Sequence, residues 1–197
     1  MSKSDPSSTK KERNKTVRWV IIIFLVTIFI SAVISFASTE LMSDSSMTVA
    51  FIILLVIILL GILFDVIGVA VTSADEKPFH SMAAHKVNGA QEAIKLLRNT
   101  EKVSTICNDV IGDVCGVVSG SASATIAALV INNVNLGWPR GITLAMSALV
   151  AGLTVGGKAI GKGFAMKSAT SVVYSVGRIL YTLRNIPALF RKKKNKR

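Results

Sequence analysis

Residues 48–73 read TVAFIILLVIILLGILFDVIGVAVTS, a run of mostly apolar side chains in which Asp65 is the one charged residue. About twenty apolar residues, at about 1.5 Å of helix rise each, cross a bilayer core of roughly 30 Å. The run is therefore long enough to span a membrane with some tilt. A carboxylate at membrane depth costs about 3 kcal/mol or more, so it usually faces a partner, a cavity or an ion. We expect Asp65 to face another polar group within the protein.

The rest of the chain has the same character. It has 197 residues, 51% of them hydrophobic and 17% charged, which is unusual for a soluble domain. Further apolar runs predict spans at about 19–38, 103–131 and 141–161. The first run also resembles a signal peptide, but it is longer than such a segment usually is. We predict an all-α polytopic membrane protein, with a helical membrane domain over 19–190 and four transmembrane helices.

Two polar segments carry a helical apolar period without being apolar enough to cross a membrane. Between residues 74 and 102, apolar side chains recur at steps of three and four, and a second such pattern covers 165–183. These patterns predict two amphipathic helices that lie along the membrane interface. His80 and His85 fall in the first of them, and we expect both at the headgroup level.

The basic residues indicate an orientation. Of 23 Lys and Arg, six precede the first span, five lie between the second and third, eleven follow Val155, and only Arg140 falls on the other side. The positive-inside rule then predicts cytoplasmic termini in a plasma or inner membrane. We expect residues 1–18 to be a disordered basic tail. The polybasic tail 191–197 is expected either to bind anionic lipids or to be a topology signal without lipid specificity.

Other functional classes have less support. The formal net charge is +12, but the Lys and Arg are concentrated in the tails and one loop and aromatics are only 6%, which disfavours nucleic-acid binding. Cys107 and Cys115 are too far apart along one helix for a disulfide and form no CxxC pair, so we interpret them as small packing residues. No nucleophile constellation lies near either histidine. We predict no enzymatic activity.

The third span begins with unusual polarity, since residues 107–120 read CNDVIGDVCGVVSG. At about 100° per residue, Asp109, Asp113, Gly116 and Gly120 fall on one face of a helix. With Gly112, the glycines form a doubled GxxxG pattern, which lets another helix approach closely. The pattern does not decide whether that helix belongs to the same chain.

Several acids are predicted at a similar depth. Counted at about 1.5 Å per residue from the predicted cytoplasmic ends, Asp65 lies about 12 Å deep, Asp109 about 9 Å and Asp113 about 15 Å. With Asn108 and free helix carbonyls they could form an oxygen shell for Mg²⁺. The alternative is an acid neutralised by protonation or in a structural ion pair, since Lys158 and Lys162 lie near the predicted cytoplasmic end of the fourth span. Chemistry alone leaves both readings open.

The order of these segments resembles the transmembrane domain of the CorB/CorC and cyclin-M family, which is associated with magnesium and cobalt transport. Where that family has a pattern like FSGSETALTSL, residues 64–74 read FDVIGVAVTSA. Residues 78–113 are similar to the family's amphipathic stretch followed by an apolar helix with an Ile-Gly-Asn, and Asn108 falls on that asparagine. Its GEILPK-like run corresponds to GKAIGK at 157–162.

The departures from the family pattern bear on function. Residues 65–68 replace a polar turn whose serines would line the cation site, and Lys158 stands where a glutamate contact is expected. We also expect no cytosolic CBS domain pair, since only about thirty residues follow Lys167.

The resemblance implies a homodimer and divalent cation transport or binding, with Asp65, Asn108, Asp109 and Asp113 as ligands. The alternative is a non-transporting interaction or regulatory subunit, in which Lys158 neutralises a degenerate site.

Overall fold

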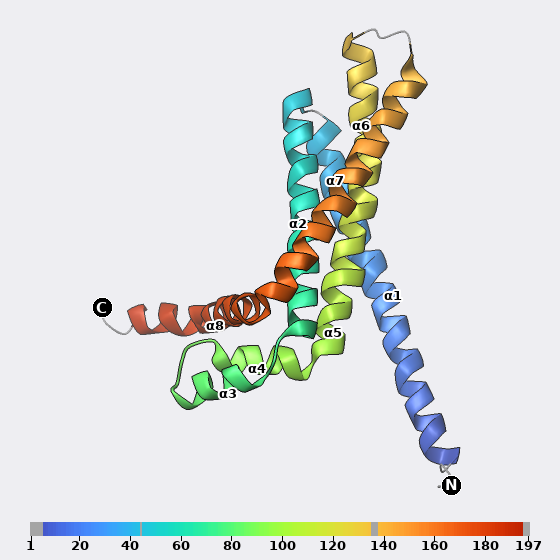
Figure 1. Ribbon diagram of the computed structural model, residues 1–197. Helices are drawn as coiled ribbons and strands as arrows, with labels where there is room; N and C mark the ends of the chain where they lie inside the picture. The colour runs from blue at the N-terminus through green and yellow to red at the C-terminus, as the bar shows by residue number, and fades with distance from the viewer. Residues whose placement is uncertain (1–5, 44, 135–137, 195–197) are drawn as a thin grey trace.

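The computed structural model describes residues 6–43, 45–134 and 138–194, with side chains described over 16–42, 45–131 and 138–185. Over these residues the chain forms helices joined by short connections, without a strand. Four helical segments are long and apolar enough to cross a membrane: Thr16–Met42, Met47–Ser73, Thr100–Ile131 and Pro139–Lys167. Figure 1 shows these segments as the tall part of the molecule. The described residues thus confirm four helices of the length and composition that a membrane span requires, at or around the four predicted ranges.

Helix α1 (Pro6–Ser43) is the most peripheral of the spans. It contacts α2, α6 and the segment before α6, yet the apolar window within it is 0% buried inside the protein. Large side chains such as Phe24, Phe29 and Phe36 are exposed, as expected for a surface that faces lipid. The structure describes residues 6–18, part of the tail predicted to be disordered, as the beginning of this helix. Proline suits a helix start, and the Lys, Glu and Arg that follow are good helix formers.

Helix α2 (Met47–Ser73) is the centre of the bundle, in contact with α6 (Asp113–Val134), α7 (Pro139–Lys167) and five other helical segments. Close approach to its neighbours depends on glycine. A Cβ on Gly61 would lie 2.9 Å from the Cβ of Cys115, and one on Gly161 would lie 2.8 Å from a methyl group of Val66. The side chains between these helices form two apolar clusters, one around Ile58 and Ile126 and one around Val118.

The third span is not one continuous α-helix. It consists of α5 (Thr100–Ser104), a π-helix η1 (Thr105–Gly112) and α6. At the end of the π-helix, the backbone N–H of Asp113 donates to the carbonyl of Asn108, five residues earlier. Each π turn takes up more residues than an α turn. The 3.6 residues per turn assumed in placing Asp109 therefore do not hold over Thr105–Gly112.

Three shorter or lateral helices meet at one end of the spans, and we call them the platform: α3 (Lys77–Ala84), α4 (Ala90–Arg98) and α8 (Ala169–Lys194). The amphipathic segment predicted over 74–102 is thus divided. Its break is a turn that contains Lys86 (φ 57°) and Gly89 (φ 90°). A Cβ on Gly89 would lie 2.7 Å from the backbone of Arg178, so glycine serves both the turn and the α8 contact.

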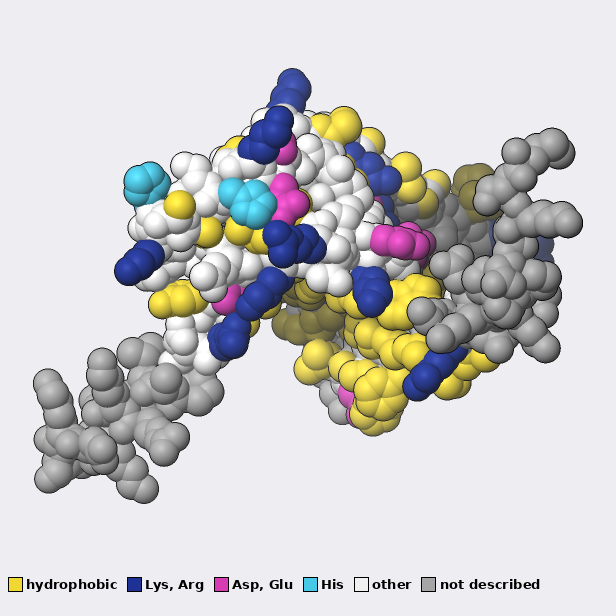
Figure 2. Space-filling view, turned by 90° about the horizontal axis from the view of Figure 1, so that it is seen from below, with side chains coloured by type: hydrophobic (Ala, Val, Ile, Leu, Met, Phe, Trp, Pro, Cys, Tyr) yellow, Lys and Arg dark blue, Asp and Glu magenta, His cyan; other side chains and the backbone are white. Residues whose placement is uncertain are grey.

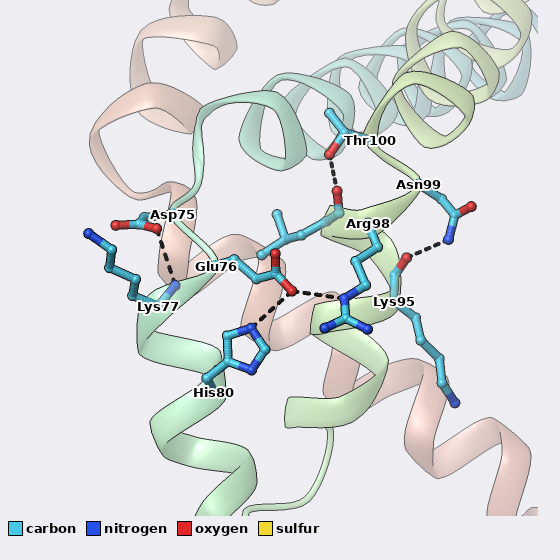
Figure 3. A network of polar contacts seen from close by, with 9 residues as sticks. Asp75, Glu76, Lys77, His80, Lys95, Arg98, Asn99 and Thr100 are labelled. Atoms are coloured by element: carbon cyan, nitrogen blue, oxygen red, sulfur yellow. Dashed lines mark hydrogen bonds and ion pairs between the residues drawn. The ribbon is translucent and has the colours of Figure 1, made fainter.

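The platform shares an apolar core with the adjoining ends of α2 and α7 and has a polar outer surface. In this core, Phe79 of α3, Val71 of α2 and Val173 of α8 are almost fully buried. On the outside, a Glu76 carboxylate oxygen lies 3.0 Å from His80 Nε2 and 3.0 Å from Arg98 Nε, which links α3 to α4 (Figure 3). Figure 2, seen from the platform end, shows basic, acidic and histidine side chains spread over this surface.

Candidate functional site

The site is centred on the side chain of Lys158, which α7 places between two acidic residues of other helices. Its Nζ lies 3.5 Å from Oδ1 of Asp65 on α2 and 3.3 Å from Oδ1 of Asp113 at the start of α6. The same nitrogen donates to the carbonyl oxygen of Gly112, at 3.1 Å. One ammonium group is therefore surrounded by three oxygens from two other spans.

The two carboxylates have different surroundings. The side chain of Asp65 is 4% exposed and that of Lys158 is 16% exposed, whereas that of Asp113 is 71% exposed. Removing Asp65 from water is costly unless a charge faces it, and the Lys158 ammonium provides that charge. Asp113 can keep water on its outer oxygens. We therefore regard Asp65 and Lys158 as a buried ion pair, and Asp113 as a second, solvent-exposed carboxylate that also contacts Lys158.

Glycine makes room for this pair. A Cβ built on Gly112 would overlap Oδ1 of Asp65 and approach the Cys107 carbonyl to 3.2 Å. Because Gly112 has no side chain, the backbone of the third span comes close enough for its carbonyl oxygen to accept a hydrogen bond from the Lys158 ammonium group. The first glycine of the doubled GxxxG pattern thus packs within the chain.

Asn108 lies one helical turn from this centre and packs against α2. Its Nδ2 donates to Ser104 Oγ at 3.2 Å, while Oδ1 is buried and has no hydrogen-bond partner among the described residues. A Cβ on Gly68 would overlap the Asn108 amide, so this glycine is what lets the amide fit there. An unpartnered buried oxygen costs about 1–3 kcal/mol. Among the predicted ligands, Asn108 is thus the one with a buried acceptor oxygen that has no partner among the described residues.

Asp109 does not join the others. Its side chain is exposed, and the structure gives it no ion pair or hydrogen bond with any described residue. The neighbouring Cys107 and Val110 are buried, whereas Asp109 lies on the exposed side of the π-helix. Of the four predicted ligands, the structure brings Asp65 and Asp113 together at Lys158 and leaves Asp109 outside.

An open groove between α6 and α7 leads to this cluster. It has a volume of about 520 Å³ and ends at Asp113 and Lys158. Gly116 and Gly120 border it, and a Cβ on either would meet nothing within 4 Å. Sequence reasoning missed Ser119 and Thr154, two hydroxyl residues that also line the groove. Their signal was available, since both are polar residues within predicted spans.

The arrangement bears directly on metal binding. The three oxygens around the amine are hard donors of the kind that Mg²⁺ prefers, but the Lys158 ammonium occupies the point where they converge. Over the described residues, no group of three or more His, Cys, Asp or Glu side chains could hold a metal ion. With Lys158 in this position, the residues do not fit a bound Mg²⁺.

Comparison with known proteins adds no relative: no family model, no curated protein and no solved structure matches this chain.

Proposed function

We propose that this chain is an integral membrane protein of the CorB/CorC type in which the Lys158 amine takes the place of a bound cation, and that it acts as a non-transporting interaction or regulatory subunit. The observation that carries the proposal is the position of Nζ, 3.5 Å from Asp65 and 3.3 Å from Asp113. These contacts join α2, α6 and α7 through a tethered positive charge.

Charge and space both favour this reading over metal transport. Two carboxylates and one ammonium sum to −1, so the amine removes half of the negative charge that would attract a divalent ion. The amine also fills the central position and holds the Gly112 carbonyl. An ion would have to displace a lysine whose side chain is only 16% exposed and whose withdrawal leaves Asp65 buried without a partner.

An interaction role is supported by the groove beside the pair. Gly116 and Gly120 have open space beyond their Cα atoms, as do Gly152 and Gly156 on α7. Small residues of this kind let a further transmembrane helix approach closely. We propose a homodimer through this groove. Gly120→Leu should then lower the dimer fraction measured by light scattering in detergent, whereas Ser121→Leu, also exposed on α6, should leave it unchanged.

Divalent cation transport is the second candidate, because two observations favour it. Asp113 is 71% exposed on a groove of about 520 Å³, which gives water and ions access to the acidic cluster. Asn108 Oδ1, close by, has no partner among the described residues and could serve as a ligand to an ion. In that mechanism Lys158 would leave the carboxylates while the ion binds.

Magnesium flux in liposomes separates the two candidates. The purified chain would be reconstituted into liposomes that enclose a magnesium-sensitive dye. Lys162→Gln, which removes a positive charge one turn after Lys158 on α7, would serve as a control. We expect parent and control to match empty vesicles. A parent flux above empty vesicles that Asp65→Asn abolishes would overturn the non-transporting proposal and support the second candidate.

A further inference from the structure

We infer that the exposed side of α8 binds an anionic phospholipid, with the lipid phosphate at Arg178 and an acyl chain along Ile179 and Leu183. This inference concerns the platform and does not depend on what the Lys158 site does. It also differs from a general attraction of the basic tails, because it assigns the lipid to one cleft on described residues.

The position of α8 is the first support. Helix α8 lies across the direction of the long spans and nearer to them than α3 and α4 do (Figure 1). Its other side is covered, since Val173 is fully buried and a Cβ on Gly177 would lie 2.6 Å from the Gly89 carbonyl oxygen. The side turned away from α4 is therefore the one that a bilayer surrounding the spans would meet.

The composition of that side is the second support. Ile179 and Leu183 are 58% and 56% exposed, and four residues apart they lie within about 40° of each other on the helix. They line a shallow cleft of about 380 Å³ together with Ser175, Arg178 and Thr182. An apolar strip beside a cation and hydroxyl groups is typical of a helix in the headgroup region.

Charge is the third support. Arg184, further along α8, faces Glu92 at 3.6 Å, whereas Arg178 has no ion pair with any described residue. A guanidinium presents parallel N–H donors that match two oxygens of a phosphate. The last turns of α7, before α8 begins, also expose the apolar side chains Ile160 and Phe164. A phospholipid is the ligand that satisfies both the charge and the apolar strip.

The test uses the full chain in a mild detergent, titrated with phosphatidylglycerol and followed by native mass spectrometry. Removing one cationic contact should weaken lipid binding about fivefold, so Arg178→Gln should raise the dissociation constant by about that factor. Arg140→Gln, a matched change at the far end of α7, should leave it unchanged. Ile179→Ser should weaken binding of the same lipid, because it shortens the apolar strip.

Three comparisons decide the outcome. Phosphatidylcholine should bind more weakly than phosphatidylglycerol to the parent, and the difference should shrink in Arg178→Gln. Inorganic phosphate should not compete, since it lacks the acyl chain, and effective competition would overturn the lipid assignment in favour of a simple anion site. The inference would also fail if Arg178→Gln matched the parent while neutral replacements of the basic residues in 191–197 removed binding.

Discussion

The Lys158 amine and the Asp65 carboxylate, 93 residues apart in sequence, lie 3.5 Å apart between α7 and α2, with both side chains largely shielded. A charged residue in the middle of an apolar run requires compensation, and this lysine provides it. The pairing also changes the meaning of the acidic residues. They hold a structural cation that belongs to the chain, and a transported ion would have to compete with it.

Glycine at positions 68 and 112 should be required for this geometry. Gly112→Ala places a methyl group on the Asp65 carboxylate, and Gly68→Ala places one on the Asn108 amide. We expect each to lower the unfolding free energy by about 1–3 kcal/mol, the usual cost of overpacking, measured by thermal or denaturant unfolding in detergent. Gly152→Ala is the control, because its Cβ would meet nothing within 4 Å. Equal stability of Gly112→Ala and the control would contradict the close approach.

Asn108 offers a separate test of metal binding. Leucine has nearly the same shape, and the amide oxygen it removes has no partner among the described residues. We therefore expect Asn108→Leu to change the unfolding free energy by less than about 1 kcal/mol, even though the bond to Ser104 is lost. If Asn108 instead held an ion or a fixed water, the loss would be larger and would depend on added Mg²⁺. A magnesium-dependent change in melting temperature that only the parent shows would refute our reading.

The predicted orientation can be tested with single cysteines. The native Cys107 and Cys115 are both buried and would be replaced by alanine. A membrane-impermeant maleimide added to intact cells should then label Thr143→Cys, near Arg140, but not Asn88→Cys on the platform, since the positive-inside rule places the platform in the cytoplasm. The reverse pattern of labelling would show that the platform faces outward.

Much of the fold followed from apolar runs alone. The stretch at 48–73 contains a single charge, which makes it unambiguous as a span, and it is the central helix of the bundle. The need of Asp65 for a partner also followed from its depth, and Lys158 was one of the two partners considered. These features were predictable because a charge in an apolar run has few acceptable surroundings.

The local geometry of the third span was not predictable in the same way. No simple periodicity distinguishes a π-helix from an α-helix, so the wider turn over Thr105–Gly112 was not predicted. The break in the amphipathic segment did have a signal, because Asn88 and Gly89 form a dipeptide typical of turns. The close contact of Gly89 with α8 depends on a residue far along the chain, which no local pattern reveals.

The most direct test of the account is a double-mutant cycle between Asp65 and Lys158, built from Asp65→Asn, Lys158→Gln and the double variant. Breaking a buried pair from one side costs about 3–5 kcal/mol, whereas removing both charges costs much less. We predict a coupling free energy of about 2 kcal/mol or more for this pair, and below about 1 kcal/mol for exposed Asp113 with Lys158. Additive effects of Asp65→Asn and Lys158→Gln would contradict the claim that the amine stands in for a cation.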